Sequence, residues 1–127
     1  MEEEFEKIRN WVENKLDSFS HLIEFTIGKS TDCEERYKTY YQPKGYSNYI
    51  VLAYGEPKNI DQGEEFLIGY FRKHPKWKEK NANEREGGGG NNKASNLYLA
   101  VKYEVKEFDE LFDELLQEEW KPIDLDR

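Results

Sequence analysis

The chain has 127 residues and a formal net charge of -8, with 36% hydrophobic and 36% charged residues. This length suits one domain with a single core, and the 15% aromatic content argues against general disorder. A single cysteine, Cys33, excludes an internal disulfide and a cysteine-rich zinc site. Because no signal segment opens the sequence and no run approaches about 18 apolar residues, we expect an intracellular protein, cytoplasmic or nuclear, with no membrane contact.

The acidic residues gather toward the two ends of the chain. Residues 1–20 carry six acidic and three basic residues, residues 21–96 carry eleven acidic and twelve basic, and residues 97–127 carry ten acidic and four basic. The net charges of these three segments are therefore -3, +1 and -6. The middle segment can therefore present a basic surface to phosphates, although lysine runs are also typical of a solvated face. Its basic clusters contain Lys29, Arg36, Lys38, Arg72, Lys73, Lys76, Lys78 and Lys80.

The first half of the chain alternates between helix and strand patterns. Apolar residues recur at three- and four-residue steps over 2–17, which predicts an amphipathic helix. Residues 22–27 are rich in β-formers and precede Gly28, the pattern of a strand followed by a turn. A capped helix should follow and end near Tyr41, because Pro43 comes soon after.

The second half continues this alternation. Residues 48–54 form a continuous apolar run typical of a central strand, and 61–73 predict a helix. The polar, glycine-rich segment 76–96 predicts a long loop, which is usually functional or disordered. Residues 97–105 then predict a strand, and apolar spacing over 106–120 predicts a second amphipathic terminal helix.

This order predicts a small α+β fold. We expect a mainly antiparallel three-stranded sheet flanked by helices. The domain should span residues 1–127, with a core over about 22–105 and terminal helices over about 2–17 and 106–120.

Arg36 and Tyr40 are the first candidates for chemistry. They are spaced i, i+4 on a predicted helix, so both side chains can reach one phosphate oxygen or the water that attacks it. The plainer interpretation is that Arg36 pairs with Asp32 or Glu35 on the helix surface and that Tyr40 packs over the core.

The segment from Thr26 to Tyr40, T-I-G-K-S-T-D-C-E-E-R-Y-K-T-Y, resembles the second half of the GIY-YIG nuclease motif. Further along, Glu64 resembles the family's metal-binding glutamate, and the Asn81 or Asn83 region resembles the asparagine after that helix. The resemblance covers about residues 22–92 and implies a GIY-YIG-like core with added terminal helices. The matching positions in the first segment are Ile27, Gly28, Ser30, Asp32, Arg36 and Tyr40.

The sequence departs from the family pattern in the first strand. Thr26 replaces the tyrosine of the YIG element, and the region expected to hold the GIY strand predicts a helix. We hypothesise a circular permutation, in which the strand at 97–105 fills the vacant edge beside the Gly28 strand. Tyr98 or Tyr103 would then replace the lost tyrosine.

The resemblance implies metal-assisted hydrolysis of a phosphodiester in DNA or RNA. Glu64 would hold Mg²⁺, a cation that suits hard oxygen ligands and keeps several waters. Arg36 would donate to a nonbridging oxygen, and Tyr40 or Tyr98 would take the proton from water, with Lys29 lowering the tyrosine pKa. The candidate substrate-binding residues are Gly28, Ser30, Lys38, Arg72, Lys73 and Asn81.

The alternative is a catalytically inactive GIY-YIG-like module. It is supported by the absent GIY strand, by Thr26, and by two acidic amphipathic helices whose exposed sides can engage a basic partner. Such a module would bind a protein or a nucleic acid without cleaving it. The enzyme hypothesis requires Arg36, Glu64 and a tyrosine hydroxyl to line one open cleft.

Overall fold

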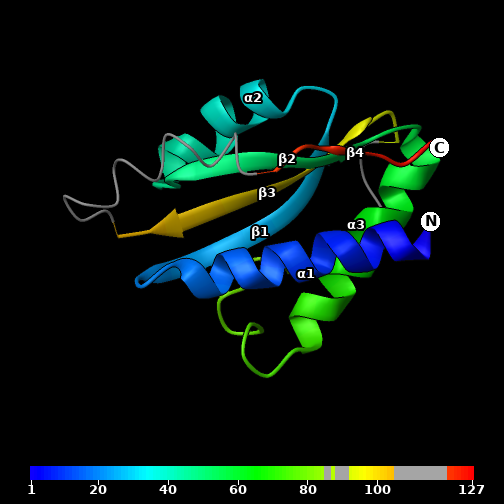
Figure 1. Cartoon of the computed structure of the whole chain (residues 1–127). Coiled ribbons are helices and arrows are strands. Elements are labelled where there is room, and N and C mark those ends of the chain that lie inside the picture. Colours follow the sequence, from blue (N-terminus) through cyan, green and yellow to red (C-terminus); the bar gives the residue numbers. More distant parts are fainter. Residues whose placement is uncertain (85–86, 88–91, 105–119) are drawn as a thin grey trace.

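A computed structural model describes residues 1–84, 87, 92–104 and 120–127 (Figure 1). In this part of the chain, an α+β arrangement places helices against a mixed sheet, and no helix is long and apolar enough to cross a membrane. The elements in chain order are α1 (Glu2–Ser18), β1 (Leu22–Ser30), α2 (Cys33–Arg36), the π-helical turn η1 (Tyr37–Tyr41), the 3-10 turn η2 (Gln42–Lys44), β2 (Asn48–Tyr54), α3 (Pro57–Lys73), β3 (Asn96–Tyr103) and β4 (Ile123–Asp124).

The described sheet has four strands in the order β1-β3-β2-β4. Strand β3 is antiparallel to both neighbours, whereas β4 is parallel to β2. The expected α+β class is confirmed, but the three-stranded antiparallel sheet is corrected by the addition of β4. Two residues are too few to show a period-2 pattern, so this strand could not be predicted from periodicity.

The sheet separates two layers of helices (Figure 1). Helices α1 and α3 pack on one face over the larger core, and α2 with its following turns covers the other. In α1 the predicted apolar stripe is buried, and Ile8 and Val12 have no exposed surface. Each such side chain stabilises the fold by about 1.5–3 kcal/mol. The smaller core is mostly tyrosine, including Tyr37, Tyr41 and Tyr98.

Strand β3 lies directly beside β1, as the permutation hypothesis required. The register pairs Gly28 with Tyr98 and Thr26 with Ala100. The strand ends at Tyr103, earlier than the predicted residue 105. The strand that comes late in the chain therefore occupies the central position next to the Gly28 strand.

The outer edge of β1 is covered by the segment that follows α3. The Phe25 amide donates to the Lys80 carbonyl at 2.9 Å, and the Ala82 amide donates to the Phe25 carbonyl at 2.8 Å. Trp77 anchors the same segment in the main core with 4% of its surface exposed. The first part of the predicted loop is thus fixed to an otherwise open strand edge, which also protects that edge from pairing with other chains.

Several predicted boundaries change for local reasons. Helix α3 begins at Pro57, before the predicted residue 61, because proline fits the first turn of a helix. The helix expected to end near Tyr41 continues as η1 and η2 through Lys44, with Pro43 in the first turn of η2. The predicted helix 106–120 lies outside the described residues except for Trp120, whose ring packs at a tilt against Trp11 with 4.9 Å between ring centroids.

The carboxy-terminal residues cap α3. No side chain within α3 caps its first turn, but the Asp126 carboxylate accepts from the Glu56 amide at 2.8 Å and from the Asn59 side chain at 2.9 Å. A carboxylate is favourable at the positive end of a helix dipole. Strand β4 and its following turn thereby fix the amino-terminal end of the helix that carries Glu64.

Candidate functional site

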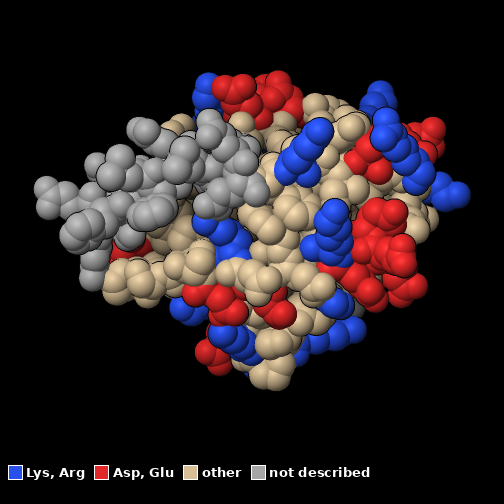
Figure 2. Space-filling model, viewed as in Figure 1, with Lys and Arg blue, Asp and Glu red and all other residues tan. Residues whose placement is uncertain are grey.

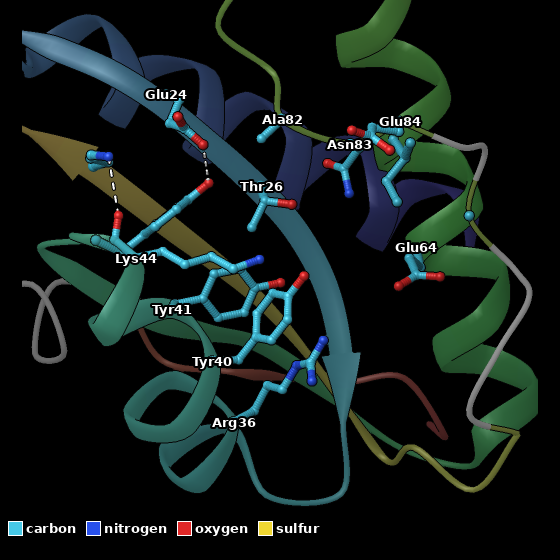
Figure 3. Close-up of a pocket in the computed structure, with 14 residues that line it drawn as sticks. Glu24, Thr26, Arg36, Tyr40, Tyr41, Lys44, Glu64, Ala82, Asn83 and Glu84 are labelled. Atoms are coloured by element: carbon cyan, nitrogen blue, oxygen red, sulfur yellow. Dashed lines mark hydrogen bonds between the residues drawn. The ribbon is translucent and has the colours of Figure 1, made fainter.

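A pocket of about 700 Å³ lies beside β1, between the α2 side of the sheet and α3 (Figure 3). Its walls come from β1, from the turns after α2, from α3 and from the segment that covers the β1 edge. The described residues that line it are Glu24, Thr26, Arg36, Tyr40, Tyr41, Lys44, Tyr46, Glu64, Ile68, Ala82, Asn83, Glu84, Gly87 and Lys102.

Three of the predicted catalytic residues meet in this pocket. Arg36 and Tyr40 enter from the helical layer on one side, and Glu64 enters from α3 on the other (Figure 3). The geometric condition set by the enzyme hypothesis is therefore met: an arginine, a glutamate and a tyrosine line one pocket.

Arg36 and Tyr40 lie side by side, as their spacing predicted. The Arg36 guanidinium carbon is 3.9 Å from the Tyr40 ring centroid. Asp32, the plainer partner for Arg36, instead caps α2 by accepting from the Glu35 amide at 3.1 Å. Burial lowers the pKa of Arg36, but hydrogen bonding to Tyr98 and the nearby tyrosines raise it by more. The guanidinium therefore stays charged at the pocket wall.

Lys44 is a site residue that the sequence analysis missed. Its Nζ lies 3.6 Å from the Tyr40 ring centroid, and its hydrogen bonding and positive charge lower the Tyr40 pKa. Tyr40 is 39% exposed, so solvent can reach it. The detectable signal was the i, i+4 spacing of Tyr40 and Lys44, which persists because the chain continues as η1 and η2 past the predicted helix end.

Lys29 does not take the role expected of it. Side chains alternate along β1, so Lys29 points toward α3, whereas Thr26 and Gly28 point toward the tyrosine layer. The Lys29 ammonium pairs with Asp61 and is 5% exposed. The cation beside the candidate general base is therefore Lys44.

Tyr98 on β3 pairs with Gly28 on β1, and its ring lies over that glycine, outside the pocket lining. A Cβ atom added at Gly28 would be 2.2 Å from the Tyr98 hydroxyl oxygen, so this cross-strand pair requires a glycine. The Tyr98 and Tyr41 hydroxyl oxygens are 2.7 Å apart, and Tyr98 is 4% exposed. Burial raises the Tyr98 pKa, so this phenol stays protonated and has no phenolate with which to take a proton. Tyr103 stacks on Phe19 at 4.7 Å, outside the pocket lining.

Glu64 forms the acidic side of the pocket together with Glu84. Although glutamate is a polar residue, Glu64 is only 8% exposed. Gly87, the first residue of the predicted glycine run, packs against the backbone here: an added Cβ atom would be 2.8 Å from the Glu65 nitrogen. The close approach explains a glycine at this position and places Gly87 against the Glu64 backbone and Cγ.

The donors suit one kind of metal better than another. Within the described ranges, no three His, Cys, Asp or Glu side chains are grouped so that they could hold an ion. A closed zinc-type cage is therefore not formed by these residues. The Glu64 carboxylate in a pocket open to water does fit Mg²⁺, which is commonly held by one or two carboxylates and retains waters.

Asn83 lines the pocket but has a structural function. Its side-chain oxygen accepts from the Ile27 amide at 3.0 Å, and its side-chain nitrogen donates to the Ile27 carbonyl at 2.8 Å. Asn81 orients it by accepting from the Asn83 amide at 2.7 Å. These asparagines therefore extend the sheet edge with side-chain hydrogen bonds and place Glu84 at the pocket.

None of the predicted substrate-binding residues lines the pocket. Ser30 shapes the turn before α2 by accepting from the Asp32 amide at 3.1 Å, and Lys38 pairs with Glu34 at 2.8 Å. Arg72 and Lys73 are in the last turn of α3. Of the predicted set, only Gly28 is close to the site, through its contact with Tyr98. The residues that do not line the pocket are Gly28, Ser30, Lys38, Arg72, Lys73 and Asn81.

No protein-family model matches the chain, and neither a curated protein nor a solved structure matches it. The function is therefore argued from the residues and their geometry.

Proposed function

We propose that this protein is a GIY-YIG-like endonuclease that hydrolyses phosphodiester bonds with a divalent metal. The proposal rests on one observation: Arg36, Tyr40 and Glu64, from two different helical layers, line the same pocket. The pairing of β3 with β1 supports a permuted form of the family core, in which a late strand replaces the missing first strand.

The basic side of the pocket would bind the scissile phosphate. Arg36 is charged and presents a planar donor fork, which matches two phosphate oxygens better than an ammonium group does. Its position on the Tyr40 ring would bring the bound phosphate close to the phenol oxygen. Arg36 would thus orient the phosphate and stabilise the negative charge that develops on it.

Tyr40 is the better candidate for the general base. Lys44 lowers its pKa, and its exposure lets a water molecule reach it. As the water oxygen forms its bond to phosphorus, the phenolate would take the water proton, and the bond to the leaving oxygen would break. Tyr98, the second candidate, is buried and has a raised pKa, so we assign it to the support of the site.

Glu64 would hold the metal, with Glu84 on the same wall. A bound Mg²⁺ would supply charge neutralisation at the phosphate and its leaving oxygen. The low exposure of Glu64 and the close packing of Gly87 would keep its carboxylate oriented toward the pocket.

The inactive interaction module stays as the second proposal, favoured by one feature of the site. Tyr98 comes from the strand that replaces the lost one, yet it does not line the pocket itself, because its buried hydroxyl is hydrogen-bonded to Tyr41 and Arg36 in the wall. A scaffold that keeps its shape but has lost a reactive tyrosine would bind partners without cleaving them.

Cleavage of supercoiled plasmid and single-stranded RNA with Mg²⁺ tests the proposal. We expect Arg36→Gln and Glu64→Gln each to lower the rate by at least about 10²-fold, the usual effect of removing one preorganised electrostatic group. The matched controls are Lys38→Gln and Glu65→Gln, which remove the same charges outside the pocket lining. Absence of cleavage by folded wild-type protein would favour the inactive module.

A further inference from the structure

The pocket has room and charge for very few phosphates. Arg36, Lys44 and Lys102 are its cations, and Glu24, Glu64 and Glu84 are its acids, so the described lining carries no net positive charge. Proteins that bind duplex DNA through its backbone usually neutralise several phosphates with clustered Lys and Arg. This site offers no such cluster among the described residues.

Some of the pocket groups are already committed to other contacts. The Lys102 ammonium donates to the Lys44 carbonyl at 3.1 Å. Glu24 accepts from the Tyr46 hydroxyl at 2.5 Å, which fixes a carboxylate at one end of the pocket. Arg36 and Lys44, both next to Tyr40, are therefore the cations best placed for one phosphate.

Lysines elsewhere do not extend this site into a continuous phosphate track. Lys29 pairs with Asp61, Lys38 with Glu34, and Lys76 with Asp17. The face in Figure 2 shows the same mixing, with Lys and Arg interspersed among Asp and Glu and no continuous basic band. The chain as a whole carries a net charge of -8, which opposes the approach of a long polyanion.

The size of the pocket agrees with a small ligand. Its volume of about 700 Å³ falls in the range of small-molecule sites, roughly 300–1,000 Å³. A single phosphodiester with one nucleoside on each side is a ligand of this size.

We propose that this site binds a dinucleotide-sized segment of a flexible single-stranded phosphodiester chain, which contacts the protein through one or two phosphates, in place of a nucleic-acid duplex. This inference rests on the proposed function for its chemistry, but it concerns binding and can be tested without catalysis. One phosphate contact predicts a weak salt dependence, whereas a duplex site predicts a steep one.

Equilibrium binding without added metal separates the two ligands. The probes are a fluorescently labelled thymidine dinucleotide, pTpT, and a 20-base-pair duplex with the same label, each measured at 50 and 200 mM salt. We expect pTpT to bind at least as tightly as the duplex and to lose only about 3- to 10-fold in affinity over this salt range, as one or two contacts require. Arg36→Gln should weaken pTpT binding by about 10-fold or more, while Lys38→Gln should leave it within 2-fold.

Two results would overturn the inference. One is duplex binding at least 10-fold tighter than pTpT, with a loss of 10²-fold or more between the two salt concentrations. The other is no saturable pTpT binding up to 1 mM by protein whose circular dichroism shows it folded. If pTpT binds saturably but is not hydrolysed in Mg²⁺, the inferred ligand class is supported and only the proposed catalytic function is refuted.

Discussion

Replacing Gly28 with alanine tests the contact on which the candidate site is built. The new Cβ would lie 2.2 Å from the Tyr98 hydroxyl oxygen and 2.4 Å from the ring carbon that carries it. Tyr98 is 4% exposed, and its hydroxyl is fixed at 2.7 Å from that of Tyr41, so the ring has little room to move. Either the two strands separate or the Tyr98 ring leaves its site.

The size of the effect follows from three contributions. Overpacking a core costs about 1–3 kcal/mol. Loss of the hydrogen bond between Tyr41 and Tyr98 adds about 1 kcal/mol, and alanine returns up to about 1 kcal/mol because it is less flexible than glycine when unfolded. We therefore expect Gly28→Ala to lower the free energy of unfolding by roughly 1–4 kcal/mol. Positive φ plays no part here, since the described glycines with that geometry are Gly45 and Gly55.

Urea denaturation followed by circular dichroism measures this change, and two further variants make it specific. Gly69→Ala is the matched control: nothing lies within 4 Å of its added Cβ, and it should stabilise α3 by about 0.5–1 kcal/mol. In a Tyr98→Leu background the phenol is gone, so most of the cost of Gly28→Ala should disappear. An equal cost in both backgrounds, or a cost below about 0.5 kcal/mol, would refute the placement of Tyr98 across Gly28.

Three other variants or labelling tests report on the site and its supports. Lys44→Met removes the charge that lowers the Tyr40 pKa, so the phenolate absorbance of Tyr40 should titrate at higher pH. Burial raises the pKa of Cys33 from its ordinary 9.0 to about 12, so a thiol reagent at pH 8 should label the folded protein far more slowly than the urea-unfolded chain. The pKa of Cys33 is higher in the folded than in the unfolded protein. Its contribution to the free energy of unfolding is therefore fully present below pH 9 and is lost as the pH rises toward 12. Asn83→Ala removes two hydrogen bonds to Ile27 and should lower the free energy of unfolding by about 1–3 kcal/mol, with faster hydrogen exchange at the Ile27 amide.

Each of these predictions has a matched comparison. Lys38→Met is the control for Lys44→Met, because Lys38 pairs with Glu34, and it should leave the pKa of Tyr40 unchanged. A Tyr40→Phe variant identifies which part of the absorbance change belongs to Tyr40. Equal labelling rates for folded and unfolded protein would contradict the burial of Cys33. Asn92→Ala, at an exposed position, should be nearly neutral. If Asn92→Ala lowered the free energy of unfolding as much as Asn83→Ala, the two hydrogen bonds between Asn83 and Ile27 would not explain the loss.

Local patterns in the sequence predicted the elements well. The helical stripe of α1 and the apolar run of β2 form where they were predicted. Strand β1 also forms, but it continues through Gly28 to Ser30, so the turn predicted after residue 27 is wrong: cross-strand pairing with β3 extends the strand. The i, i+4 contact of Arg36 and Tyr40 follows from helix geometry over one turn, so it too was predictable. By contrast, β4 is too short for any periodic signal and gains its place from pairing with β2.

The composition of the site depended on contacts between distant segments. Lys29 and Lys44 were equally plausible cations by residue type, and the side-chain alternation of β1 together with the extra turns after α2 decided between them. Asn83 resembled a site asparagine, but its amide is used by the backbone of Ile27. Tyr98 faces Gly28 only because of the register of β3 on β1.

The sequence by itself determined which short segments form helices and strands and which neighbouring side chains share a face, because these depend on periods of two and 3.6 residues. It also determined that the Arg36 and Tyr40 side chains lie next to each other. Only the tertiary structure decided that β3 pairs with the Gly28 strand and that Glu64 faces Arg36 across one pocket. The reason is physical: strand register and the meeting of two layers are set by packing among residues far apart in the chain, which local periodicity does not encode.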